Sequence, residues 1–258
     1  MVLKFSHSDK RSSCKPVSLN SQVTQRRETL EKEKANIAKR YWNNEAVETL
    51  VSDLSSLMDR LILEAWHEQI SATQDIALFA VGGYGRQELH PGSDIDLLVV
   101  AKNPKKHSRA IELFLQNVFD LNVEVGHAVR DLSGCVNECK ADITVATAMF
   151  ERRQLAGDTT IEVAIGQALT QKKVWPAEKF FAAKYQEQVD RHKQFDDVDY
   201  NLEPNIKASP GGMRDIHTTL WICNRNFGTT DIYQLVELGV LTEEESKWLF
   251  EGRRFLWW

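Results

Sequence analysis

Two aspartates, Asp94 and Asp96, stand one residue apart at the start of the apolar segment 94–101, and such a pair could bind a metal ion. Side chains in a β-strand alternate between its two faces, so both carboxylates point the same way. Two negative charges side by side repel each other unless a cation lies between them. Mg²⁺ commonly takes one or two carboxylates together with phosphate oxygens, so the pair predicts a metal and phosphate site.

A glycine pair, Gly82 and Gly83, follows the apolar segment 76–81 and predicts a tight turn after a buried strand. Backbone without side chains can approach a ligand closely, and its N–H groups can cradle phosphate oxygens. A Walker loop is excluded, because Gly85 is followed by Arg86 and Gln87 rather than by Lys and Ser or Thr. A dinucleotide-binding fingerprint is excluded because its third glycine is missing.

The order of these features resembles the signature of the polymerase-β-type nucleotidyltransferase superfamily: an apolar strand, a Gly-Gly turn, ten intervening residues and Asp-x-Asp in a second strand. The resemblance implies a third carboxylate from a later strand. Glu124, flanked by Val123 and Val125, fits that position, and Asp120 lies nearby as a competitor.

The chemistry that this resemblance implies is nucleotidyl transfer assisted by two Mg²⁺ ions. Asp94 and Asp96 would bridge both ions, and Glu124 would help to hold the ion that activates the attacking hydroxyl. The triphosphate and the leaving pyrophosphate would be neutralised by the second ion together with Gly82, Gly83, Arg86 and Ser93. For Arg86 an alternative stays open, since it could simply pair with Glu88.

A closer resemblance rests on four segments, VGGYGRQELHPGSDIDLL, NVEVGHAVRDL, ERRQLAGD and YNLEPNIKASPGGMRDIHTTLW. Together they resemble the N-terminal part of the bacterial bifunctional uridylyltransferase and uridylyl-removing enzymes that modify the PII nitrogen-signalling protein. The resemblance implies Mg²⁺-dependent transfer of UMP from UTP to a tyrosine hydroxyl of PII. In that family the removing activity is marked by a His-Asp pair, which this sequence lacks, and the glutamine-sensing domains follow later in the chain.

Two other functions stay open from the sequence. One is a catalytically silent module that binds a nucleotide or PII. The other is an adenylyltransferase that acts on glutamine synthetase or on a small molecule. No motif distinguishes uracil from adenine.

A polar segment, 200–215, contains Pro204 and Pro210-Gly211-Gly212 and is expected to be a stiff loop. Its Lys207 and Arg214 are suited to gripping the phosphates or ribose of a nucleotide. The alternative is a structural connector, in which Arg214 and Asp215 pair or Asp215 caps the helix that follows.

The elements that position these residues follow from the hydrophobic pattern. Segment 26–70 predicts one long helix, or two that meet near Trp42-Asn43-Asn44. Strands are expected over 76–81, 95–101 and 121–129, with a helix over 106–119. A turn is expected at 155–158, and helices over 132–139, 143–151, 160–170, 176–195 and 216–226.

We therefore expect an α/β (α+β) fold: a polymerase-β-like nucleotidyltransferase palm with a small mixed sheet, N-terminal helices and a C-terminal helical domain. The expected boundaries are a mobile arm over 1–24, an N-terminal helical segment over 25–72, the palm over 73–150 and a helical domain over 151–258. The apolar ending Phe255-Leu256-Trp257-Trp258 suggests a shortened chain.

Composition limits the class of protein. The 258 residues are 42% hydrophobic and 27% charged, with a net charge of -5, which disfavours a nucleic acid as partner. No apolar stretch predicts a membrane span or a secretory signal, so the expected location is the cytoplasm, without a membrane partner. The four cysteines form no CxxC pair and are expected to be reduced thiols without a metal.

Overall fold

The protein is described by a computed structural model, which covers residues 21–71, 74–170, 173–195 and 205–258. Its described residues divide into two compact units, one within 1–133 and 151–163, the other within 134–150 and 164–258. Of the mobile arm expected over 1–24, residues 1–20 lie outside the described residues, and residues 21–24 belong instead to a helix. The domain boundaries drawn from the sequence stay predictions.

The first unit is built on a four-stranded mixed sheet in the order β3-β2-β1-β4. The strands are β1 (Ile76–Ala80), β2 (Ile95–Ala101), β3 (Val125–Arg130) and β4 (Arg153–Gly157). β1 is antiparallel to β2 and to β4, whereas β2 and β3 are parallel. The expected mixed sheet is confirmed, and β4 corrects the turn predicted over 155–158, since the half-buried sequence RQLAG shows no clear period of two.

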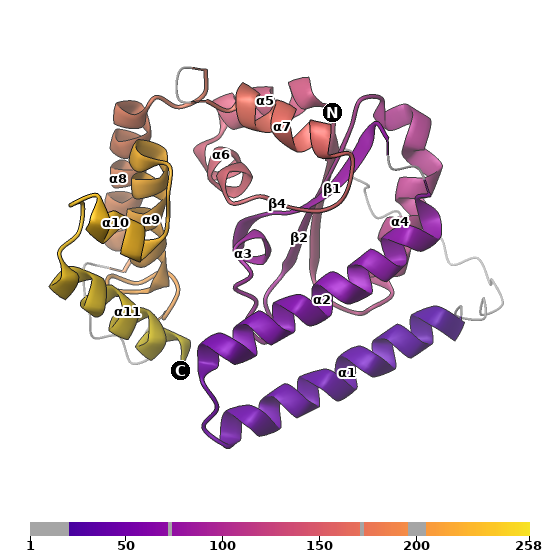
Figure 1. Cartoon of the computed structure of the whole chain (residues 1–258), viewed down its shortest axis with the longest axis horizontal. Helices are drawn as coiled ribbons and strands as arrows, with labels where there is room; N and C mark the ends of the chain where they lie inside the picture. Colours follow the sequence, from indigo (N-terminus) through magenta and orange to yellow (C-terminus); the bar gives the residue numbers. More distant parts are fainter. Residues whose placement is uncertain (1–20, 72–73, 171–172, 196–204) are drawn as a thin grey trace. The chain divides into compact units, whose positions relative to one another are not determined.

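Two long helices, α1 (Ser21–Trp42) and α2 (Val47–Gln69), lie alongside each other (Figure 1). Asn44 between them has a φ of 61°, a left-handed conformation that ends the first helix. Segment 26–70 was predicted to form one long helix or two, and the prediction of two helices is therefore correct. Leu54, Met58 and Leu61 of α2 are buried in one core with β1, β2 and the helix α4 (Ser108–Phe119), which follows the 3-10 turn η1 (Pro104–His107).

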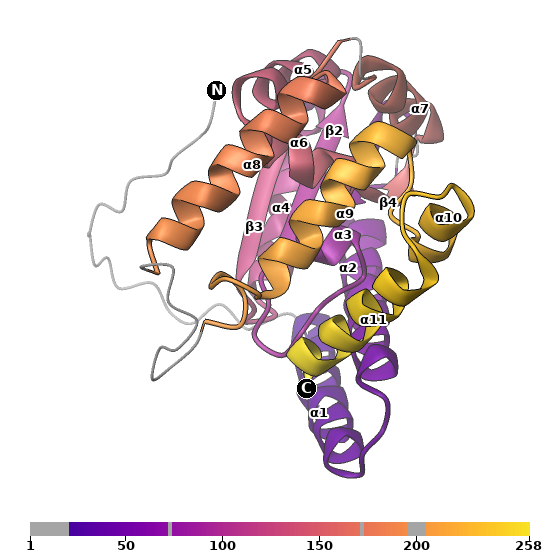
Figure 2. The same cartoon turned by 90° about the vertical axis from the view of Figure 1, so that its left-hand side faces the viewer.

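The helices that follow β3 along the chain are α5 (Leu132–Ala141), α6 (Ile143–Phe150), α7 (Thr159–Ala168), α8 (Ala177–Lys193), α9 (Met213–Phe227), α10 (Ile232–Glu237) and α11 (Glu243–Trp257). In the second unit α8 and α9 run side by side (Figure 2). Thr242 begins α11 with a capping box to Glu245, a signal that we did not use to predict this helix.

No helix in the described part of the chain is both long enough and apolar enough to cross a membrane.

Candidate active site

The parallel pairing of β2 and β3 brings the three predicted carboxylates to one end of the sheet. Asp96 is paired with Gly126, and Ile95 with Val125. The amide of Ile95 also donates to the carbonyl of Glu124 at 2.8 Å. Asp94 and Glu124 thus precede neighbouring strands at matching positions, both exposed, while Asp96 is half-buried within β2. The strand predicted from residue 121 begins only at Val125, so Glu124 lies just before it.

The carboxylate of Asp96 lies between two glycines. A Cβ atom at Gly126 would stand 2.3 Å from Oδ1 of Asp96, and one at Gly82 would stand 3.3 Å from its Oδ2. A side chain at position 126 would therefore displace the carboxylate. Sequence analysis missed Gly126, although a glycine inside a strand often marks a close approach.

The glycine pair forms a single helical turn, α3 (Gly82–Gly85), rather than the tight turn expected. Gly82 has a φ of 59°, a conformation that glycine adopts at little cost. The amide of Val81, just before the turn, donates to the carbonyl of Asp96 at 3.1 Å. The turn is thereby fixed to β2 at the central aspartate.

Arg86 lies between two carboxylates. Its guanidinium contacts Glu88 at 2.6 Å and Glu151 at 2.7 Å. Burial alone would lower the pKa of Arg86, but the charges of Glu151 and Glu88 raise it. The pairing with Glu88 that the sequence left open is therefore present, and a second acid also compensates this charge.

Ser93 is part of the loop that leads into β2. Its Oγ accepts a hydrogen bond from the amide of His90 at 3.0 Å, and its own amide donates to the carbonyl of His90 at 3.0 Å. These bonds close the turn immediately before Asp94. The hydroxyl thus shapes this loop in the structure.

The second unit holds the other two predicted nucleotide ligands, Lys207 and Arg214. Residues 205–212 form a compact loop, whereas residues 200–204 lie outside the described part. The amides of Met213 and Arg214 donate to the carbonyls of Ile206 and Lys207, both at 2.9 Å. Because loop carbonyls accept these amides, the start of α9 is capped from within the chain. The Lys207 side chain is exposed, and the Arg214 guanidinium lies 5.3 Å from the centre of the Trp221 ring.

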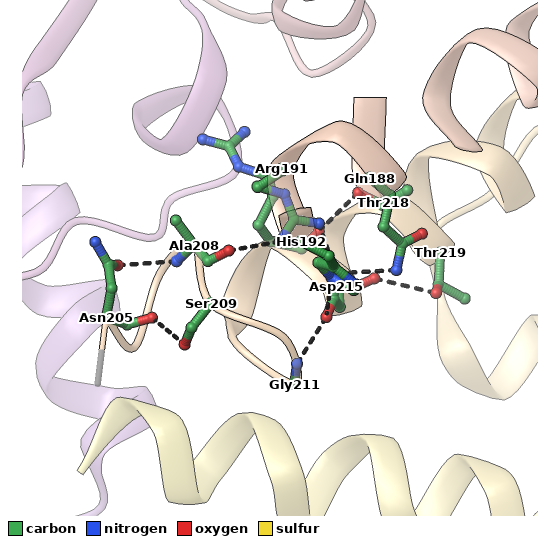
Figure 3. A network of polar contacts seen from close by, with 11 residues as sticks. Gln188, Arg191, His192, Asn205, Ala208, Ser209, Gly211, Asp215, Thr218 and Thr219 are labelled. Atoms are coloured by element: carbon green, nitrogen blue, oxygen red, sulfur yellow. Dashed lines mark hydrogen bonds and ion pairs between the residues drawn. The ribbon is translucent and has the colours of Figure 1, made fainter. Parts of the chain in front are cut away.

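Asp215 joins this loop to α8, as Figure 3 shows. Its Oδ1 accepts hydrogen bonds from Gln188 at 3.0 Å and Arg191 at 2.6 Å, and contacts His192 Nε2 at 3.0 Å. Its Oδ2 accepts from the amide of Gly211 at 2.8 Å. Burial acts to raise the pKa of Asp215, but these hydrogen bonds outweigh it and hold the pKa below its usual range. The predicted N-cap role is wrong: Gly212 is the N-cap residue of α9, and Asp215 lies in its first turn.

The carboxylates at the start of β2 fit Mg²⁺ in their chemistry. Carboxylate oxygens are ligands that this ion prefers, and one or two of them suffice when phosphate oxygens complete the coordination. Gly82 and Gly126 carry no side chain, so no Cβ atom at these two positions stands against either carboxylate oxygen of Asp96. In the described ranges, no three His, Cys, Asp or Glu side chains form a group that could hold a metal ion by themselves.

Two parts of the chain match models of known protein families. Residues 60–153 match the family model of the nucleotidyltransferase domain, and residues 179–258 match the model described as GlnD PII-uridylyltransferase. The carboxylates and the glycine turn lie within the first match, and Lys207 and Arg214 lie within the second.

The chain is also similar to proteins named bifunctional uridylyltransferase/uridylyl-removing enzyme. It is 40% identical to the protein of Photobacterium profundum over 90% of this chain and 27% of that protein. It is 44% identical to that of Stutzerimonas stutzeri over 82% of this chain and 24% of that protein. The chain thus spans about a quarter of the length of these curated relatives.

A crystal structure of a toxin-antitoxin with AMP-PNP is similar over 54% of this chain and 97% of that chain, at 19% identity and a TM-score of 0.30, which is too weak a likeness to bear on function. The family and sequence matches together show that the chain contains a nucleotidyltransferase domain and is similar to part of the proteins named uridylyltransferase.

Proposed function

We propose that this nucleotidyltransferase transfers UMP from UTP to a tyrosine hydroxyl of the PII signalling protein and releases pyrophosphate. The observation that carries the proposal is the Asp96 carboxylate, which lies between the glycine turn and Gly126 at the end of a mixed sheet. The names of the relatives support uridylyl as the transferred group, and the match over 179–258 supports PII as the acceptor.

In this proposal the residues at the start of β2 would hold Mg²⁺. Asp94 and Asp96 would contribute to both ions, and Glu124, on the neighbouring strand, would help to hold the ion that activates the attacking hydroxyl. When bound, Mg²⁺ supplies a lowered pKa for the attacking hydroxyl and positive charge against the triphosphate. Asp94 directly precedes β2 and Asp96 is its second residue, so the alternation of an extended chain lets both carboxylates face one ligand.

The nucleotide is held by groups around this centre. Gly82 and Gly83 present backbone amides without side chains in the way, and Ser93 shapes the loop that leads to Asp94. Arg86 pairs with Glu88 and Glu151 and orients the end of the glycine turn. Its guanidinium also adds positive charge beside the nucleotide phosphates. Lys207 and Arg214, which belong to the second unit, stay proposed as ligands of phosphate or ribose in their own right.

The reaction balances without any further co-reactant. The phenol oxygen of the acceptor tyrosine forms a bond to the α-phosphorus of UTP, and the bond from that phosphorus to the oxygen bridging to the β-phosphate breaks. Pyrophosphate leaves with that oxygen, and the phenol proton is lost to solvent. Positioning and charge neutralisation supply most of the rate in such transfers.

We assign only the transfer direction to these residues. The resemblance links uridylyl removal to a His-Asp pair, and no His-Asp dipeptide occurs in the sequence. We also propose that the enzyme works in the cytoplasm, where UTP is available, and that its partners are UTP and PII rather than a nucleic acid or a membrane.

The test is a calorimetric titration of UTP, ATP, CTP and GTP into the protein with Mg²⁺, repeated with Asp96→Asn. Selective UTP binding that requires Mg²⁺ and weakens in the variant would support the proposal, and PII would then be added to look for a uridylylated tyrosine. Preference for ATP would favour an adenylyltransferase. Binding of no nucleotide would favour a silent module.

A further inference from the structure

The ion pair between Arg153 of β4 and Asp59 of α2 connects two elements beside the glycine turn. Arg153 Nη1 lies 2.7 Å from Asp59 Oδ2, and Nη2 lies 2.9 Å from Oδ1. Both carboxylate oxygens are thus bound by one guanidinium, an arrangement that fixes the orientation of both side chains. Neither side chain is fully exposed, with exposed fractions of 26% for Arg153 and 19% for Asp59.

The same guanidinium contacts the backbone of the glycine turn. It donates to the carbonyl of Tyr84 at 3.3 Å and to that of Gly85 at 3.4 Å. It also lies 5.6 Å from the centre of the Tyr84 ring, which is fully buried. Arg153 therefore fixes the last two peptide groups of α3 while Asp59 fixes Arg153.

The backbone just before β4 confines the turn from the same side. A Cβ atom at Gly85 would stand 2.1 Å from the carbonyl oxygen of Glu151, so the turn and this segment are in close contact. The side chain of Glu151 binds Arg86, the residue after the turn. Residues 151–153 thus hold the end of α3 through both backbone and side chains.

The other end of the turn contacts the proposed catalytic carboxylate. Gly82 lies against Oδ2 of Asp96, and the amide of Val81 donates to the Asp96 carbonyl. Because the turn has only four residues, we expect a shift at Tyr84 and Gly85 to move Gly82 as well. A change at Arg153 is therefore transmitted to the space beside Asp96.

We propose that Arg153 is a positioning residue for nucleotidyl transfer: braced by Asp59, it holds the glycine turn in the geometry that receives the nucleotide beside Asp96. This role rests on the proposed function, since it gives the turn a nucleotide to receive. Arg153 is the first residue of the strand β4, which the sequence pattern did not predict. Its partner Asp59 lies on α2, far away in the sequence.

The adjacent residue offers a matched control. Arg152 also binds a carboxylate with two nitrogen atoms, at 2.9 Å and 2.8 Å, but this carboxylate is that of Glu162 on α7. Arg152→Gln removes an equivalent ion pair one residue away. A loss of stability from a broken ion pair is common to both variants, whereas the proposed effect on the glycine turn belongs to Arg153.

The experiment compares Arg153→Gln, Arg153→Lys and Arg152→Gln in the full chain by two measurements. The first is hydrogen exchange of the amides over residues 82–88, which needs no nucleotide. The second is the dissociation constant for UTP with Mg²⁺. Arg153→Gln is expected to speed exchange in this segment and to weaken UTP binding by on the order of tenfold or more, because misplaced contacts cost orders of magnitude.

Arg153→Lys keeps the charge but loses the two-pronged geometry, so an intermediate effect on both measurements is expected. Arg152→Gln is expected to leave both near the parent values. Equal UTP binding by the parent protein and Arg153→Gln would overturn the inference, even with faster exchange. A parent protein that binds no nucleotide would instead overturn the proposed function, and unchanged exchange in Arg153→Gln would overturn the positioning contact by itself.

Discussion

At the scale of single residues, Asp96 owes its position to Gly126, a residue on the neighbouring strand. Because Gly126 has no side chain, the Asp96 carboxylate can lie beside it; a Cβ atom at position 126 would stand 2.3 Å from Oδ1 of Asp96. We predict that Gly126→Ala lowers UMP transfer by roughly 10-fold to 100-fold, because the carboxylate must move while its charge is unchanged. Steady-state transfer to PII, with circular dichroism to verify the fold, measures this effect.

Gly252 provides the control for that substitution. It lies in α11, its Cβ would meet nothing within 4 Å, and its φ is not in the left-handed region. Gly252→Ala is expected to keep full activity. Equal activity of the two alanine variants would show that Asp96 does not need the space at position 126.

Glu124 and Asp120 compete for the role of the third carboxylate. Glu124 directly precedes β3, beside the start of β2, whereas Asp120 follows the end of α4. We predict that Glu124→Gln lowers transfer by more than about tenfold at low Mg²⁺. Loss of a metal ligand is expected to reduce activity at least as much as loss of a residue that only hydrogen-bonds to a ligand. Asp120→Asn should leave transfer unchanged when activity is titrated against Mg²⁺. The reverse ranking would make Asp120 the ligand.

The residues that the sequence revealed differ in kind from those it did not. Asp94, Asp96 and the glycine pair form a local pattern, and their order along the chain carries the information. Gly126, Asp59 and Arg153 act through strand register and through contacts between elements distant in sequence. Such contacts depend on the folded arrangement, so no short-range pattern announces them.

At the scale of elements, the loop before α9 is held by one aspartate. The Asp215 carboxylate contacts the side chains of Gln188, Arg191 and His192 on α8 and accepts a hydrogen bond from the amide of Gly211 in the loop. The backbone of this loop requires its two glycines. Gly211 has a φ of 76°, and a Cβ atom at Gly212 would stand 2.6 Å from the carbonyl oxygen of Ile206. These contacts support the structural connector that the sequence left open, beside the nucleotide contacts proposed for Lys207 and Arg214.

The lowered pKa of Asp215 gives this cluster a pH dependence. A carboxylate whose pKa is lower in the folded protein stabilises it above the unfolded pKa of about 3.9, and this contribution is lost as the pH falls through the folded value. We predict that Asp215→Asn lowers stability by roughly 2 kcal/mol at neutral pH, through the lost charged hydrogen bonds. The difference from the parent protein should shrink below about pH 4.

Thermal unfolding of both proteins across this pH range measures the effect. Asp190→Asn is the control, because Asp190 is 58% exposed and pairs with Lys193 on the surface, a kind of ion pair that contributes little. A stability difference for Asp215→Asn that does not change with pH would contradict the assignment of the pKa shift.

The elements predicted from the sequence were those with a strong period. Five apolar residues in β1 and a nearly continuous apolar β2 identified the central strands. β4 was missed because all five of its residues are half-buried and its pattern resembles a turn. What makes these residues a strand is the pairing of β4 with β1, a tertiary effect that local propensity does not report.

At the scale of the whole molecule, the chain leaves the sheet-containing unit after residue 133 and returns to it over 151–163. The returning segment supplies β4, which covers the edge of β1, and it supplies Glu151 and Arg153 to the glycine turn. The boundary at residue 150 that we drew from the sequence would separate these residues from the sheet. The site therefore depends on a second passage of the chain.

This dependence predicts different behaviour for two fragments that differ by only a short segment. A fragment of residues 1–163 keeps β4, whereas a fragment of residues 1–150 leaves β1 as an edge strand with unpaired backbone groups. Exposed edges of buried, apolar strands promote association, and β1 is buried along its whole length. We predict that the shorter fragment aggregates or unfolds at a lower temperature than the longer one, measured by size-exclusion chromatography and thermal unfolding. Both fragments carry residues 134–150 without the rest of the second unit, so that loss is matched between them. Equal melting temperatures would mean that β4 is an accessory to the sheet, and the case for Arg153 as a positioning residue would then weaken with it.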